Sequence, residues 1–121
     1  MFLATINRPK QLLWMSFIET VGVAELEKAH AEVVSLFGEL TNGFRLVTDL
    51  SQLDSMEVAC TTEIARIMEL CDQKGVGLVV RIIPDSTKDI GLNILTLFHY
   101  QKRPRVATCR NIAEAARLLA L

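Results

Sequence analysis

The sequence predicts an α/β fold in which a mostly parallel sheet follows an N-terminal β-hairpin. Short apolar, β-branched runs alternate with longer stretches whose apolar residues recur every three or four positions. Strands and helices that alternate in this way form right-handed βαβ units within one sheet. Half of the residues are hydrophobic and the mean hydropathy is +0.31, which is typical of strands buried on both faces. The predicted order is ββαβαβαβα, in a single domain spanning residues 1–121.

The first two strands are expected at residues 2–7 and 11–18, where apolar and β-branched side chains predominate. The three residues between them include a proline and have turn chemistry, so the strands should pair as a hairpin. Residues 24–40 predict the first helix, and Asn42 with Gly43 provides a common helix stop. The apolar residues at helical spacing are Leu26, Ala29, Val33, Phe37 and Leu40.

The central strand is predicted at residues 44–50, followed by a polar loop that leads into a helix beginning at Met56. Asp54 and Glu57 have the spacing of a capping box, in which each side chain satisfies a backbone amide near the other. One stripe of the helix is apolar, and the sequence Lys-Gly-Val-Gly at 74–77 ends it. The residues of that stripe are Cys60, Ile64, Ile67, Met68 and Cys71.

Two more strands and two more helices complete the predicted order. A β-branched strand is expected at residues 78–83, a third helix at 89–100 and a short strand at 106–109. Asn111 and Glu114 then repeat the helix-cap pattern, which predicts a last helix.

Composition and charge exclude several classes of protein. The net charge of −1 argues against electrostatic binding to nucleic acid, which needs a basic face. The three cysteines form no CxxC pair, so a disulfide framework or a metal site is not expected, and a reducing cytoplasmic location fits them. No apolar run approaches the length of a membrane span, and the first residues do not resemble a signal peptide.

The main candidate site is the polar segment after the central strand, because ligands and partners of open α/β sheets dock at the carboxyl ends of strands. Its polar side chains are Asp49, Ser51, Asp54 and Ser55. They could form an anion site at a helix N-terminus, or Asp54 or Ser55 could simply cap the helix. Both interpretations remain open from the residues alone.

Catalysis has no positive support in the sequence. His30 and His99 lie in regions without a partnering cysteine or carboxylate motif. The chain contains no pattern typical of a Ser-His-Asp set, a phosphate-binding loop or a metal site. We therefore expect a protein without enzymatic activity, cofactor or metal.

The element order and the segment Leu-Val-Thr-Asp-Leu-Ser-Gln-Leu-Asp-Ser resemble the STAS family of anti-sigma-factor antagonists and sulfate-transporter cytoplasmic domains. Members of that family show Asp-Leu-Ser, two or three residues, and then Asp-Ser-Ser-Gly before a helix. Residues 49–51 and 54–55 match this motif, and the likeness extends over nearly the whole chain. The resemblance implies a STAS-like fold and a regulatory role through protein contacts.

Two positions depart from the family motif. Met56 stands where the resemblance places the phosphorylatable serine, and Glu57 stands where it places the glycine. Phosphorylation adds nearly two negative charges at a docking surface, and Met56 has no hydroxyl to accept them. Ser55 is a weaker substitute acceptor, and Glu57 would provide a fixed negative charge. We expect a partner-docking loop at 51–57, with Met56 and Val58 as exposed apolar anchors.

The third predicted helix, residues 89–100, is apolar over more than one face. It could be an ordinary core helix, a dimer interface, or a lid over a lipid pocket, as in the CRAL-TRIO-like variant that this fold also resembles. The lid surface would comprise Ile90, Ile94, Leu97 and Phe98.

The function expected from the sequence is that of a non-enzymatic interaction module in bacterial signalling. Its partner would be a protein, such as a regulatory kinase or an anti-sigma-like protein, and a homodimer remains open. The alternative function is lipid or small-molecule binding beneath the third helix. No nucleic acid or membrane span is expected.

Overall fold

The strands of the described residues form a single five-stranded sheet in the order β1-β2-β3-β4-β5. The computed structural model describes residues 1–83 and 104–120. The first strand is antiparallel to the second, and every later pair is parallel. The strands are β1 (Phe2–Asn7), β2 (Leu12–Val21), β3 (Arg45–Met56), β4 (Leu78–Ile82) and β5 (Arg105–Cys109). The predicted hairpin, mostly parallel sheet and central third strand are thus confirmed.

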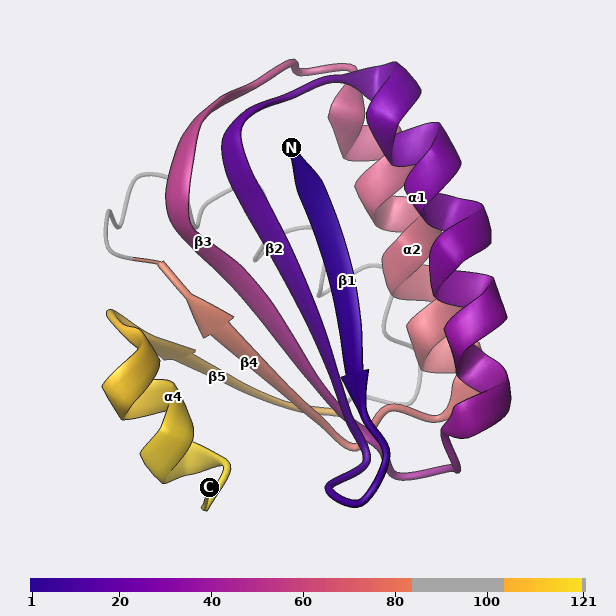
Figure 1. Cartoon of the computed structure of the whole chain (residues 1–121), viewed down its shortest axis with the longest axis vertical. Helices are drawn as coiled ribbons and strands as arrows, with labels where there is room; N and C mark the ends of the chain where they lie inside the picture. Colours follow the sequence, from indigo (N-terminus) through magenta and orange to yellow (C-terminus); the bar gives the residue numbers. More distant parts are fainter. Residues whose placement is uncertain (84–103, 121) are drawn as a thin grey trace.

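Helices cover the two faces of this sheet unequally in the described residues (Figure 1). Helices α1 (Val23–Leu36) and α2 (Cys60–Lys74) lie side by side on one face. Helix α4 (Ile112–Leu118) lies on the other face, against β4. The helix predicted at 89–100 lies outside the described residues, and the extent of a single domain over 1–121 stays a prediction.

The core has two layers because β3 and β4 are buried on both faces, as parallel inner strands require. Leu46 and Leu50 point into the layer beneath α1 and α2, whereas Val47 points into the layer beneath α4. The apolar stripe predicted for the second helix is correct throughout. The buried residues of that helix include Cys60, Ile64, Ile67, Met68 and Cys71.

The first helix ends earlier than its periodicity predicts. Helix α1 stops at Leu36, and a 3₁₀ turn, η1 (Phe37–Glu39), follows it. Gly38 weakens helix propensity inside this turn, and Leu40 is already extended, with φ −114° and ψ 152°. Gly43, at φ +91°, therefore does not end the helix. Its amide instead donates to the Gly75 carbonyl at 2.7 Å, which holds the start of β3 against the end of α2.

The predicted polar loop and capping box after the central strand are wrong. Strand β3 continues to Met56, and it stays paired with β2 through Ser55 and Met56. Helix α2 begins only at Cys60, after Ala59, and no side chain caps it. The long-range ladder with β2 supplies the backbone partners of this segment, so Asp54 cannot act as a cap.

The other two helix ends are as predicted. Helix α2 ends at Gly75, whose φ of +100° is the left-handed conformation that glycine accepts readily. Helix α4 begins after Asn111, whose side chain accepts a hydrogen bond from the Glu114 amide at 2.9 Å. The Glu114 carboxylate in turn accepts from the Arg110 amide.

Candidate functional site

The candidate site is built on an irregular pairing between β2 and β3. Ser16 lies opposite Asp49, but Ile18 lies opposite Gln52, so β3 contains one residue more than β2 over this interval. A second shift follows between Glu19 and Thr20. Such β-bulges bend a strand and redirect its side chains, and they are common beside functional sites.

The first bulge changes which side chains share a face. Leu50 and Leu53 both enter the core layer beneath α1 and α2 although they are three positions apart. In a regular strand, residues three apart would point to opposite faces. Asp49 and Gln52, also three apart, likewise lie together and line one pocket.

Asp49 holds the bulge in place. Its Oδ1 accepts hydrogen bonds from the Ser51 amide at 2.9 Å and from the Ser51 hydroxyl at 2.6 Å. The extra residue of a bulge is left out of the ladder, and Asp49 supplies the partner that this amide would otherwise lack. The Asp49 side chain is well shielded, since the residue is only 8% exposed.

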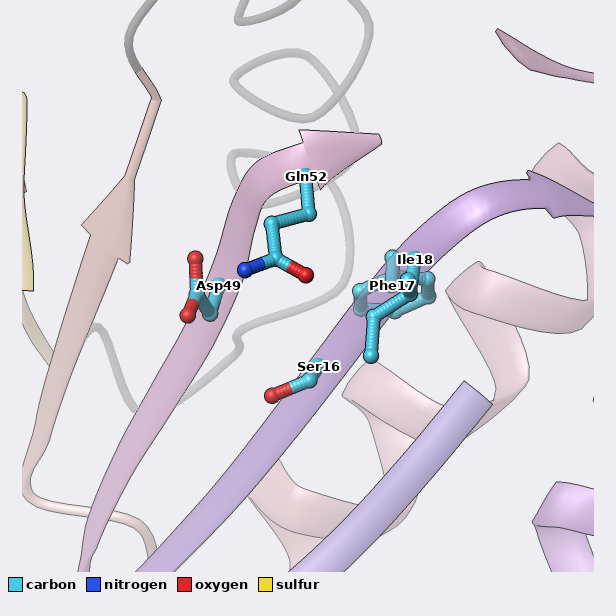
Figure 2. A pocket seen from close by; sticks show the side chains of 5 residues that line it. All are labelled: Ser16, Phe17, Ile18, Asp49 and Gln52. Atoms are coloured by element: carbon cyan, nitrogen blue, oxygen red, sulfur yellow. The ribbon is translucent and has the colours of Figure 1, made fainter. Parts of the chain in front are cut away.

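A pocket of about 120 Å³ opens at this bulge, on the face opposite α1 and α2 (Figure 2). Figure 2 shows Asp49 and Gln52 on β3 with Ser16 on the neighbouring β2. Phe17 and Ile18 are the other described residues along the pocket, but the Phe17 ring points into the core layer beneath α1 and α2, where it packs against Phe2. The described lining thus combines a carboxylate, a hydroxyl and a side-chain amide with one apolar side chain, that of Ile18.

The rest of the predicted docking segment lies farther along β3 and in the turn after it. Asp54 and Ser55 are exposed strand residues, and the Ser55 hydroxyl is 3.2 Å from the Thr20 hydroxyl of β2. Glu57 and Val58 are exposed in the turn, and Val58 is 86% exposed. The 51–57 segment is therefore mainly strand rather than loop.

Met56 does not stand out from the surface as predicted. Its side chain is half-buried and packs against the core layer beneath α1 and α2, so it anchors the end of β3 to the body of the protein. Of the two predicted apolar anchors, only Val58 is largely exposed.

The predicted lid surface cannot be placed. Its residues, Ile90, Ile94, Leu97 and Phe98, lie outside the described residues.

Neither a metal centre nor a membrane span is found in the described part of the chain. No group of three or more His, Cys, Asp or Glu side chains among residues 1–83 and 104–120 is placed to hold a metal ion. No helix within the same residues is long and apolar enough to cross a membrane.

Three residues near the site were not identified from the sequence: Ser16, Gln52 and Thr20. Ser16 and Thr20 belong to the hairpin strand, and only its pairing with β3 brings them near Asp49 and Ser55. Gln52 could not be identified from the sequence either, because two leucines three apart need no bulge in a strand that is buried on both faces. Only the register shift between β2 and β3 turns Gln52 to the side of Asp49.

Comparison with solved structures identifies the fold. A protein of the DUF3478 family from Shewanella loihica PV-4, described as having a SpoIIAA-like fold, matches with a TM-score of 0.69 at 12% identity. That match covers 98% of this chain and 92% of the other. The unphosphorylated anti-sigma factor antagonist SpoIIAA matches with a TM-score of 0.62 at 14% identity, over 100% of both chains. The chain has a SpoIIAA-like fold.

The phosphorylated form of SpoIIAA, a Bacillus cell fate determinant, gives a TM-score of 0.59 at 11% identity, over 98% of this chain and 99% of that one. No family model and no curated protein matches the sequence. These matches confirm the predicted STAS-like fold. At identities this low, SpoIIAA-like describes the fold of this chain alone.

Proposed function

We propose that the chain is a regulatory protein-interaction module without enzymatic activity, whose protein partner docks on the turn at 57–59 and the adjoining end of β3. The fold supports a regulatory role, because SpoIIAA is an anti-sigma factor antagonist. The observation that carries the docking surface is the 86% exposure of Val58. An isolated apolar side chain held in a turn at the carboxyl edge of parallel strands is well placed to enter a partner's pocket.

The surroundings of Val58 suit a partner that forms and breaks its contacts. Asp54, Ser55 and Glu57 are exposed beside it, as are Glu19 and Thr20 at the end of β2. Together they give this end of the β2–β3 ladder an acidic and hydroxyl-bearing surface, a few residues from the apolar Val58. This is the arrangement of a non-obligate interface, which has an apolar centre and a polar margin.

The module would act without a phosphorylation switch. SpoIIAA is known in both unphosphorylated and phosphorylated forms, and the family resemblance places its acceptor serine at Met56 of this chain. Methionine has no hydroxyl that could accept a phosphate, and Met56 also packs against the core. Glu57 supplies a negative charge beside the docking point that no kinase or phosphatase removes. The charge of the docking surface would therefore be the same at all times, and phosphorylation would not control binding of the partner.

A pair of valine substitutions tests the docking surface. Val58→Asp places a charge at the proposed contact, whereas Val34→Asp makes the same change on α1, where Val34 is 46% exposed. Affinity purification from the native host should recover a specific partner with the wild type and with Val34→Asp, but not with Val58→Asp. Retention of that partner by Val58→Asp, or its equal loss from both variants, contradicts the proposed surface.

Intact-mass measurement tests the missing switch. Protein isolated from its host is expected to carry no phosphate, and Met56→Ser is expected to gain one only if the host contains a matching kinase. A phosphate mapped to Ser55 of the natural chain would show that the switch persists at the neighbouring position.

A further inference from the structure

Asp49 is a buried carboxylate whose charge has no cationic partner within the described residues. It is 8% exposed, and the ion pairs among those residues involve other carboxylates, at Glu25, Glu39 and Glu63. Aspartate is seldom buried unless it is paired, because removing a charge from water is costly. The two Ser51 donors both bind Oδ1, so Oδ2 accepts no hydrogen bond from a described residue.

The pocket around Asp49 is lined for a cation that donates several hydrogen bonds. Ser16 contributes a hydroxyl oxygen and Gln52 a side-chain carbonyl, and both can accept. Among the described residues that line the pocket there is no lysine, arginine or histidine. An anion would therefore meet a buried carboxylate with no compensating positive charge, and the site disfavours it.

The arrangement selects one kind of cation. A guanidinium group prefers to grip both carboxylate oxygens in a fork, but Ser51 already occupies Oδ1. A metal ion would need more charged ligands than this one carboxylate. A primary ammonium group has three donors directed to separate acceptors. Asp49 Oδ2 and the Ser16 hydroxyl can supply two acceptors. The Gln52 side chain, whose amide nitrogen lies on the side of Asp49 in Figure 2, supplies a third when its carboxamide turns over.

We propose that the Ser16–Asp49–Gln52 pocket binds the primary ammonium head of a small amine, with a short alkyl tail against Ile18. The volume of about 120 Å³ exceeds the roughly 10–15 Å³ that a single water requires, so a head and a few methylene groups fit. The site lies on the sheet face opposite α1 and α2, and its occupation does not depend on the docking of a protein at Val58.

Amide NMR titration with n-butylammonium chloride tests the proposal on the full chain. The expected result is a saturable shift of the Ser16, Asp49, Ser51 and Gln52 amides. Tetramethylammonium carries the same charge but has no N–H donors, and 1-butanol carries the tail without the charge, so neither should produce this shift. Equal shifts with tetramethylammonium, or no saturable shift with n-butylammonium, would overturn the proposal.

Two aspartate variants separate a specific site from general electrostatics. Asp49→Asn keeps an oxygen for Ser51 but removes the charge, and it should weaken n-butylammonium binding by about tenfold or more, as expected for a charged hydrogen bond. Asp54→Asn removes the same charge from an exposed position of the same strand and should leave the affinity within about twofold. Equal weakening by both variants contradicts the assigned site.

A serine variant covers the case in which Asp49→Asn disturbs the bulge. Ser16→Ala removes one acceptor without touching the Asp49–Ser51 bonds, and it should lower the affinity severalfold while the remaining amide spectrum stays in place. Unchanged binding by Ser16→Ala would contradict the proposed geometry. Val58→Asp should bind the amine normally, so failure of the docking proposal and failure of this one can be distinguished.

Discussion

At the scale of single residues, three glycines separate the cost of an unusual backbone angle from the cost of a steric clash. Gly38 has neither feature, and a Cβ there would meet nothing within 4 Å. Gly43 has φ +91° and open space, whereas Gly75 has φ +100° and a Cβ would lie 2.5 Å from Asn42 Oδ1. The left-handed conformation costs a residue with a Cβ about 1–2 kcal/mol.

Alanine at these three positions should therefore give a graded loss of stability. Gly38→Ala is expected to be neutral or to stabilise by up to about 1 kcal/mol. Gly43→Ala should lower the free energy of unfolding by about 1–2 kcal/mol, and Gly75→Ala should lower it further. Urea denaturation measures all three, and adding Asn42→Ala to Gly75→Ala should recover the part due to the clash. A Gly75→Ala variant as stable as Gly43→Ala would contradict this interpretation.

The buried Cys71 thiol makes the free energy of unfolding decrease with rising pH in the alkaline range. Burial, and to a lesser extent the charge of Asp72, raises the pKa of this thiol from 9.0 to about 12. In the unfolded chain the thiol ionises near pH 9, while in the folded protein it stays neutral until about pH 12. Its contribution to stability is thus fully present below pH 9 and is lost as the pH rises towards 12.

The difference in free energy of unfolding between the wild type and Cys71→Ala should consequently narrow above pH 9. Below that pH the variant is less stable by a constant amount, because it lacks the buried sulfur. Above it, the wild type loses up to about 1.4 kcal/mol per pH unit that the variant does not lose. Urea denaturation of both proteins between about pH 8 and pH 10 measures this, since groups common to both cancel. A pH-independent difference would contradict the raised pKa.

At the scale of elements, the start of α4 depends on one side chain. The Asn111 Oδ1 accepts from the Glu114 amide at 2.9 Å, and this seven-residue helix is too short to be stable by itself. Asn111→Ala should lower the free energy of unfolding by about 0.5–2 kcal/mol and speed amide exchange in α4. Asn111→Asp preserves the acceptor and should be close to the wild type. Loss of stability in both variants alike would indicate a role other than capping.

The same pattern of cap residues occurs before α2, but there it predicts a helix cap that the structure does not contain. Asp54 and Glu57 have the spacing of Asn111 and Glu114, yet only the second pair caps a helix. The difference lies in β2, which supplies a ladder for residues 51–56 and leaves them extended. Periodicity and cap residues describe interactions within a few positions, so they predicted the core stripe of α2 correctly but could not detect a competing strand from another part of the chain.

At the scale of the whole molecule, Arg45 joins three segments that are distant in sequence. From the start of β3, its Nη1 donates to the Leu119 carbonyl at 2.6 Å and its Nη2 to the Lys10 carbonyl at 2.9 Å. It thereby links the hairpin turn, the central strand and the end of α4. Arg8, by contrast, makes only an exposed ion pair with Glu39 at 3.7 Å.

Arg45→Met should therefore destabilise the protein more than Arg8→Met. Loss of the part-buried charged hydrogen bond to Leu119 alone is expected to cost about 1.5–3 kcal/mol, whereas loss of an exposed ion pair costs about 1 kcal/mol or less. Chemical denaturation gives the two values, and hydrogen exchange should show faster opening of α4 only in Arg45→Met. Equal destabilisation by the two variants would show that the link across the three segments contributes little.

The fold class was predictable because strands buried on both faces read as short continuous apolar runs, while helices buried on one face carry an apolar stripe at helical spacing. The structure of the proposed docking segment was only partly predictable. Its position at the carboxyl end of the central strand was expected, but the packing of Met56 and the pairing of Ser55 with Thr20 depend on tertiary contacts. The pocket at Asp49 was not predictable from local pattern, since it exists only where β2 and β3 shift register.

The bulge at Ser51 bears on how this chain should be aligned with others. Ser51 is the residue by which β3 exceeds β2, and its amide is satisfied locally by Asp49. If Ser51 were deleted, Leu50 and Leu53 would be two positions apart, and so would Asp49 and Gln52. Residues two apart in a regular strand point to the same face, so each of these side chains would stay on its present face of the sheet. A one-residue deletion could thus be tolerated within a buried central strand. An alignment gap therefore belongs at Ser51, a position where methods that confine gaps to loops would not place one.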